Sequence, residues 1–146
     1  MPAARSRVTQ TQYELLARFR YSLRQFLSFS EQAARAAGIT PQQHQALLAI
    51  KGFAGGEGIT IGALAEFLKI RHHSAVGLVD RLSVEGYARR VPAKDDRRRV
   101  RLALSPRGEA ILEKLTYAHR AQLHGLGPEI NRLLERIRGE DASPAE

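Results

Sequence analysis

The 146-residue chain contains no cysteine and no tryptophan, and it has a single methionine. Without cysteine there is no disulfide, no thiolate nucleophile, no cysteine zinc site and no thiol-based redox sensing. No apolar run approaches the roughly 18 residues that span a bilayer, and the N-terminal stretch has no apolar signal core. These absences argue against a membrane protein, and by elimination we expect a cytoplasmic one.

Acidic residues are also scarce relative to basic ones. The chain has 23 Lys and Arg residues against 15 Asp and Glu, a net charge of +8, with arginine in the majority. Residues 60–107 hold 11 basic and 5 acidic side chains, so most of the excess lies in about a third of the sequence. A basic, well-solvated surface is one explanation. Clustering beside a helix of the size of a DNA groove favours a nucleic-acid partner instead.

Hydrophobic periodicity and turn residues predict the order of the elements. Thr40-Pro41-Gln42-Gln43 is a capping box with proline at the first helical position, and Gly125–Pro128 predicts a break or a kink in the last helical stretch. Helices are expected over about 11–37, 41–53, 61–68, 72–85, 106–123 and 130–138, and strands over 87–92 and 99–104. We expect a mainly α (α+β) fold, in which a winged helix-turn-helix core is flanked by N- and C-terminal helices.

The predicted domain organisation follows from these elements. A basic arm covers residues 1–10, a single domain residues 11–138 and a disordered tail residues 139–146. Within the domain, the winged helix takes residues 40–106, and the helices over 11–37 and 106–138 form a dimer. The flanking helices carry more apolar residues than the small core can cover, which predicts a homodimer; this set is Leu16, Phe19, Leu23, Ile130, Leu133, Leu134 and Ile137.

The helix predicted over 72–85 has a polar opening and an aliphatic face. A helix in the major groove of B-DNA contacts base edges with its N-terminal residues. The residues expected to contact DNA are Arg71, His72, His73, Ser74 and Gly77, with Leu78 and Arg81 one or two turns further on. Gly77 costs about 1 kcal/mol in a helix interior. Close approach to DNA and close packing on the preceding helix are equally good reasons for it.

The basic run Arg97-Arg98-Arg99 falls at the tip of the predicted hairpin, directly after Asp95-Asp96. A carboxylate such as Asp96 can brace an arginine side chain, and a narrow A·T-rich minor groove attracts the arginine that projects into it. The alternative is a solvated charge run. We favour insertion of the wing into the minor groove.

The histidines and carboxylates do not predict a catalytic or metal site. Adjacent side chains on a helix point about 100° apart, so His72 and His73 cannot chelate one ion together. No nucleophile stands at a recognisable spacing from a base, and no glycine-rich loop precedes a Lys-Ser/Thr pair. We expect no enzyme, no metal and no cofactor, although a zinc site shared between chains stays open.

Several motifs together resemble the multiple-antibiotic-resistance regulator (MarR) family. They are Leu64-Ala65-Glu66-Phe67-Leu68, the run Val76–Leu82, Gly86-Tyr87, Asp96-Arg97-Arg98 and the run Leu102–Gly108. The resemblance spans roughly residues 39–108. It implies a homodimeric transcription regulator that binds a pseudo-palindromic DNA site, usually a repressor relieved by a small ligand. It also implies that Arg98 is the wing arginine and Asp96 its brace.

Two departures from the family pattern affect the interpretation. Ala93-Lys94 replaces a frequent Asp-Pro, and Arg71-His72-His73 replaces small and hydroxyl residues, so the DNA half-site cannot be inferred. A small-molecule effector is expected near Phe19, Phe26, Phe29 and His44, unless these are simply core residues. The main alternative to DNA binding is a winged-helix module that binds only proteins.

Overall fold

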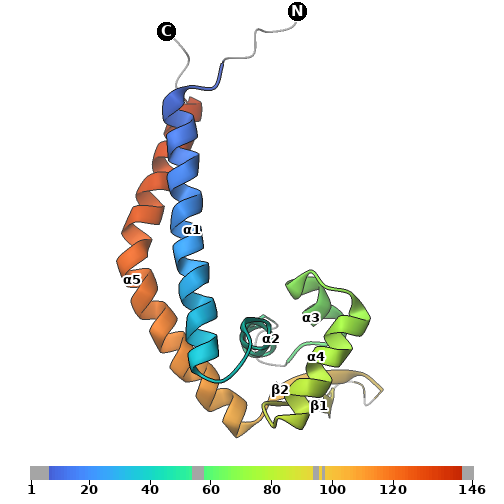
Figure 1. Cartoon of the computed structure of the whole chain (residues 1–146). Coiled ribbons are helices and arrows are strands. Elements are labelled where there is room, and N and C mark those ends of the chain that lie inside the picture. The colour runs from blue at the N-terminus through green and yellow to red at the C-terminus, as the bar shows by residue number, and fades with distance from the viewer. Residues whose placement is uncertain (1–6, 54–57, 94–95, 97, 143–146) are drawn as a thin grey trace, which may run out of the picture. The chain divides into compact units, whose positions relative to one another are not determined.

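A computed structural model describes residues 7–53, 58–93, 96 and 98–142, except for the side chains of 140–142. The elements are α1 (Gln10–Ala36), α2 (Pro41–Gly52), α3 (Ile61–Leu68), α4 (His72–Val84), β1 (Ala88–Pro92), β2 (Val100–Leu104) and α5 (Pro106–Ala142) (Figure 1). β1 and β2 pair antiparallel, with Ala88 opposite Leu104 and Pro92 opposite Val100. The predicted fold class, helical with one small hairpin, is confirmed.

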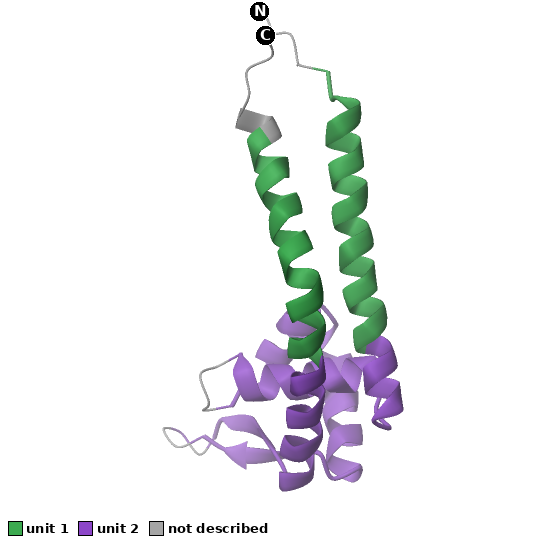
Figure 2. Ribbon diagram, turned by 90° about the vertical axis from the view of Figure 1, so that its left-hand side faces the viewer, with its two compact units in different colours: residues 1–30, 119–146 green, residues 31–118 purple. Residues whose placement is uncertain are grey.

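The chain divides into two compact units (Figure 2). Unit 1 comprises residues 1–30 and 119–146, and unit 2 comprises residues 31–118. Unit 2 contains α2, α3, α4 and the hairpin, together with the end of α1 and the start of α5. Two helices, α1 and α5, therefore belong partly to each unit.

Side-chain caps set where the helices of unit 2 begin. Thr40 Oγ1 accepts from the N–H of Gln43, and the Gln43 side chain accepts from the N–H of Thr40, both at 3.0 Å. Thr60 Oγ1 accepts from the N–H of Ala63 at 3.1 Å in the same way at the start of α3. Each cap satisfies N–H groups that have no partner within the helix. The predicted capping box is confirmed.

The hairpin is attached to the segment that precedes α3. The N–H of Leu102 donates to the carbonyl of Ile59 at 2.8 Å, and Arg101 Nη1 donates to the carbonyl of Gly58 at 3.2 Å. Gly58 has a φ of +81°, and a Cβ there would clash with the carbonyl oxygen of Leu102. Only glycine therefore fits at this close approach.

The core of unit 2 lies between its helices and one face of the hairpin. Its fully buried side chains include Leu47, Leu64, Val79, Leu82 and Leu102. The apolar periodicity of residues 41–53 predicts that Leu47 and Leu48 are both buried, but Leu48 is 44% exposed, so that part of the prediction is wrong. Leu47 and Leu48 are adjacent, and a helix turns 100° between neighbours, so only Leu47 faces the core.

In unit 1, α1 and α5 run beside each other (Figure 2). On α1, Leu15 is buried and Phe19 half-buried, whereas Leu16, Leu23 and Leu27 are 38–54% exposed. On α5, Leu133 is 2% exposed and Leu134 is 39% exposed. Leu133 is thus buried within one chain and is not available to a second one. Of the remaining residues predicted to form the dimer, Ile130 and Ile137 are half-buried, and Leu16, Leu23 and Leu134 are exposed.

α5 is one continuous helix, so of the break or kink predicted at residues 125–128 the break is wrong. Pro128 lies inside it and cannot donate a hydrogen bond to the turn before. Burial of Leu133 beyond the proline holds the second half of the helix within unit 1 and offsets this loss. The helix also reaches Ala142, so residues 139–142, which we expected in the tail, are helical. Residues 143–146 and residues 1–6 of the predicted arm lie outside the described residues.

Candidate nucleic-acid interface

The first turn of α4 is open to solvent. Arg71 at the N-cap position and His72, His73 and Ser74 after it are all exposed. Arg71 makes no side-chain hydrogen bond to the helix, in contrast to the threonines that cap α2 and α3. The N–H groups of this turn are therefore not capped by that residue. A helix start of this kind suits an acceptor such as a phosphate oxygen, and its exposed side chains can reach base edges.

The opposite side of α4 is buried in the core of unit 2. Ala75, Leu78, Val79 and Leu82 are each 1% exposed or less. Leu78, which the sequence placed toward DNA, therefore belongs to the core, and that prediction is wrong. The burial fixes the rotation of α4 about its own axis, so its polar side faces solvent.

Gly77 lies on the second turn of α4 with room around it. A Cβ added there would have only Arg81 Nη1 within 4 Å, at 3.8 Å, an ordinary van der Waals contact. Of the two reasons considered for this glycine, close packing on the preceding helix is therefore wrong. Close approach by a ligand remains.

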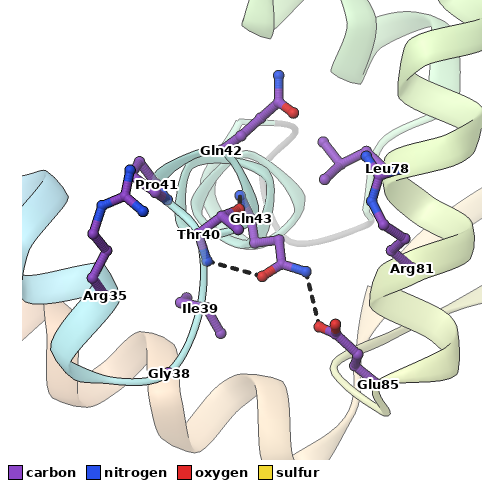
Figure 3. A pocket seen from close by; sticks show the side chains of 10 residues that line it. All are labelled: Arg35, Gly38, Ile39, Thr40, Pro41, Gln42, Gln43, Leu78, Arg81 and Glu85. Carbon is purple, nitrogen blue, oxygen red and sulfur yellow. Dashed lines mark hydrogen bonds between the residues drawn. The ribbon is translucent and has the colours of Figure 1, made fainter.

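A cavity of about 810 Å³ lies beside α4 (Figure 3). Arg35, at the end of α1, and Arg81, on α4, flank it from opposite sides. Between them the Gln43 side chain donates to Glu85 Oε2 at 2.8 Å, which ties the start of α2 to the end of α4. The remaining lining residues are Gly38, Ile39, Thr40, Pro41, Gln42 and Leu78. Arg81 is thus both a candidate DNA contact and a wall of this cavity.

The hairpin of β1 and β2 is the wing, and Asp96 shapes the turn at its tip. Its Oδ1 accepts from the backbone N–H of Arg98 at 2.9 Å, and its carbonyl accepts from the N–H of Arg99 at 3.0 Å. Asp96 thus braces the backbone of the turn, where we expected a contact to the arginine side chain. Arg98 and Arg99 are exposed. Arg97, with Lys94 and Asp95, lies outside the described residues.

One ion pair that the sequence did not predict joins the wing to α4. Arg90 Nη2, on β1, lies 2.7 Å from Asp80 Oδ1. Asp80 and Arg90 are ten residues apart in different elements, so no helical or strand periodicity relates them. The pair orients the hairpin on α4 and leaves Arg98 and Arg99 as basic groups of the tip.

The residues expected to bind an effector fall into both units. Phe19, Phe26 and Phe29 belong to unit 1, and His44 is buried in unit 2. Phe26 and Phe29 contact the ring of His119, edge to face, at centroid distances of 5.8 and 5.3 Å. His119 Nε2 also lies 2.8 Å from Ser30 Oγ. The sequence does not indicate that His119 joins these phenylalanines, because it is 90 residues from Phe29 along the chain.

No helix of the described part of the chain is long and apolar enough to cross a membrane. The family model of the MarR family matches residues 37–99, which contain α2, α3, α4, β1 and the described wing tip. Residues 37–99, somewhat less than half of the chain, are thus similar to the MarR family. The resemblance seen in the motifs of residues 39–108 is therefore confirmed.

The chain is similar to a curated protein and to solved structures. The transcriptional activatory protein BadR of Rhodopseudomonas palustris is 30% identical over 83 residues, 57% of this chain and 47% of BadR. The match thus spans about half of that relative. A MarR-family protein from Bacillus stearothermophilus superposes with a TM-score of 0.73 at 23% identity, covering 94% of this chain and all of that one. A mutant MepR from S. aureus, bound to an oligodeoxyribonucleotide, superposes with a TM-score of 0.62 at 19% identity. The match covers 93% of this chain and 97% of MepR. The fold is that of MarR-family transcription regulators.

Proposed function

We propose that the protein is a sequence-specific, double-stranded DNA-binding transcription regulator that acts in the cytoplasm as a homodimer. One observation carries the proposal. α4 buries one face in the core and presents Arg71, His72, His73 and Ser74 on the other, next to a wing with exposed arginines. The MepR structure bound to an oligodeoxyribonucleotide supports DNA as the ligand of this fold. No enzymatic activity is proposed.

The exposed residues divide between two DNA grooves. We assign the first turn of α4, with Gly77 and Arg81 behind it, to the major groove, whose base edges form a unique pattern of donors and acceptors. We assign Arg98, with Arg97 and Arg99, to the minor groove, where narrow A·T-rich segments attract arginine. Two copies related by a two-fold axis would read a pseudo-palindromic site.

Repression relieved by a small ligand is the mode that the family resemblance implies, and we propose it here. The name of the relative BadR records activation. Expression of a reporter gene fused to a target promoter, measured with and without the protein, therefore tests whether it represses or activates. The cavity beside α4 is a candidate effector site within unit 2, in addition to the aromatic cluster around His119. A ligand that contacts Arg81 there would compete with DNA for that side chain.

The direct test is selection of binding sites from random duplex DNA, followed by gel retardation of the selected sequence. We expect an enriched pseudo-palindrome and a retarded complex. Failure to retard any duplex would instead favour a winged-helix module that binds only proteins.

Gly77→Ala should raise stability and lower DNA affinity at the same time. Alanine is about 1 kcal/mol better than glycine inside a helix, and the structure has room for its methyl group. The thermal midpoint should rise by about 2–4 °C, whereas binding to the selected site should weaken by roughly tenfold, because the methyl group enters the space between helix and DNA. Calorimetry and titration on one preparation measure both. Unchanged affinity would remove Gly77 from the interface.

Mutations in α4 and in the wing should affect DNA binding in different ways. Arg98→Ala should weaken binding to many sequences, most of all where the minor groove beside each half-site is A·T-rich. Ser74→Ala or His73→Ala should instead relax the preference at defined base pairs, by about 1–3 kcal/mol if a base contact is lost. Site selection repeated with each variant measures this. Full affinity in Arg98→Ala, with unaltered preferences in the helix variants, would contradict the groove assignment.

The protein should be a dimer at micromolar concentration. Leu16, Leu23 and Leu27 on α1, and Leu123 and Leu134 on α5, are 38–54% exposed in the single chain. Burying a leucine side chain is worth about 1.5–3 kcal/mol, so exposure of this set favours association. Sedimentation equilibrium should give twice the 16.2 kDa chain mass. Leu16→Glu with Leu27→Glu should shift the equilibrium toward monomer, and a monomeric parent would overturn the expectation.

A further inference from the structure

The end of α4 is connected to the first turn of α5 through Arg107. Arg107 Nη1 donates to the carbonyl of Glu85, the C-cap residue of α4, at 2.9 Å. Its Nη2 donates to the Tyr87 hydroxyl at 3.2 Å, and its guanidinium carbon lies 4.6 Å from the centre of the Tyr87 ring. A cation is favoured at the C-terminal end of a helix, where carbonyl groups lack partners within the helix. Arg107 therefore acts as a cap on α4 supplied by another element.

Ser105 adds a second set of bonds between the same two segments. Its N–H donates to the carbonyl of Tyr87 at 3.0 Å, and its hydroxyl donates to the carbonyl of Gly86 at 2.5 Å. The N–H of Gly108 in turn donates to Ser105 Oγ at 3.0 Å. Tyr87 is itself bonded to α4, because its N–H donates to the carbonyl of Leu82 at 2.8 Å. The end of α4, the start of β1 and the start of α5 thus form one hydrogen-bonded junction.

The junction differs from the other point where a long helix enters unit 2. Both helices reach the core through apolar side chains, Ala34 on α1 and Leu112 and Leu115 on α5, but the start of α5 adds the bonds of Arg107. Apolar contacts are not directional, whereas the planar guanidinium of Arg107 is held by two acceptors at once. Arg107 is exposed, so it adds little to the burial that stabilises the core. Its geometry instead restricts the angle between α4 and α5.

We propose that Arg107 is a positioning residue that fixes the recognition helix relative to α5 and thereby sets the spacing between the DNA half-sites that the dimer accepts. The inference rests on the proposed function, because α5 continues beyond residue 118 into unit 1, where the proposed dimer contacts lie. One base pair more between half-sites turns them by about a tenth of a helical turn. If the angle between α4 and α5 is fixed, α4 cannot follow the rotated half-site and binding weakens. If the angle can vary, α4 can adjust to the rotated half-site.

The first test measures spacing tolerance. Affinities are determined for the selected duplex and for the same duplex with one base pair inserted or removed at its centre. We expect the parent to lose about tenfold or more in affinity with the altered duplexes, and Arg107→Ala to lose about threefold or less. Arg107→Lys, which keeps the charge without the fork, should fall between them. Glu109→Gln is the matched control, since it removes the ion pair of 2.7 Å to Lys51 on α2 and leaves the junction with α4 intact.

The second test needs no DNA. Hydrogen exchange of the amides of residues 85–87 should be about tenfold faster or more in Arg107→Ala than in the parent and in Glu109→Gln. Tyr87→Phe, which removes one acceptor of Arg107, should show a smaller change in the same place. The inference would be overturned if Arg107→Ala weakened binding to the selected and the altered duplexes by the same factor. It would also be overturned if hydrogen exchange at residues 85–87 were unchanged in this variant. A parent that binds no duplex would refute the proposed function alone, and the exchange measurement would still decide the role of Arg107.

Discussion

Raising the salt concentration from about 50 to about 200 mM should weaken DNA binding by roughly 10⁴–10⁵-fold. The chain has a net charge of +8, most of it within the segment that forms the winged helix. Each phosphate that an arginine neutralises releases condensed counterions from DNA, which makes binding weaker at higher salt. If a dimer neutralises about 8–10 phosphates, the logarithm of the binding constant should fall with a slope of about −7 to −9 against the logarithm of salt concentration.

Fluorescence anisotropy with the selected duplex at several salt concentrations measures this slope. Arg98→Ala removes one basic group from each wing of the dimer, so the slope should become shallower by about 1–2. Arg132→Ala is the matched control, because Arg132 lies on α5 in unit 1 and pairs with Glu129 at 3.1 Å. Its slope should equal that of the parent. A slope near zero in the parent would mean that phosphate contacts contribute little and would favour the interaction-module alternative.

Gly108→Ala should destabilise the fold by roughly 2–3 kcal/mol and lower the thermal midpoint by about 4–12 °C. A Cβ at this position would clash with the carbonyl oxygen of Tyr87 and would lie 3.0 Å from its carbonyl carbon. These are backbone atoms, so no side chain can rotate away. That carbonyl also accepts the N–H of Ser105 at 3.0 Å, and any shift of it strains the same junction.

Thermal unfolding by circular dichroism or calorimetry measures the effect of Gly108→Ala. Gly77→Ala provides the control, because it makes the same substitution inside a helix where the nearest atom is 3.8 Å away. The two variants should therefore change stability in opposite directions. Equal gains in both would mean that the first turn of α5 does not lie as close to Tyr87 as the structure has it.

The sequence by itself determined the features that depend on near neighbours. Thr40 and Thr60 begin α2 and α3 because a hydroxyl at the N-cap accepts from an N–H only three residues on. The predicted antiparallel pairing of the strands on either side of the wing also holds. The exposed set Arg71–Ser74 follows from an apolar face spaced by three and four residues along α4. Together with the motifs of residues 39–108, these local signals were sufficient for the fold class and the family.

Periodicity alone could not decide how the apolar residues divide between possible faces. Leu48 and Leu78 each fit the pattern for either side of their helices, and only packing shows that Leu48 is exposed and Leu78 buried. Gly125–Pro128 has the composition of a helix break, yet α5 continues because burial of Leu133 holds its second half. Burial by other elements outweighs a local preference of about 1–3 kcal/mol.

The tertiary structure alone determined the contacts between residues distant in sequence. Gln43 and Glu85 are 42 residues apart, and Arg107 and Tyr87 are 20 apart. No local pattern relates such pairs, because their distance depends on how helices and strands pack and on the order in which the chain connects them. The sequence indicates which residues we expect to contact DNA, and we propose that the packing around Tyr87 sets how rigidly α4 holds them.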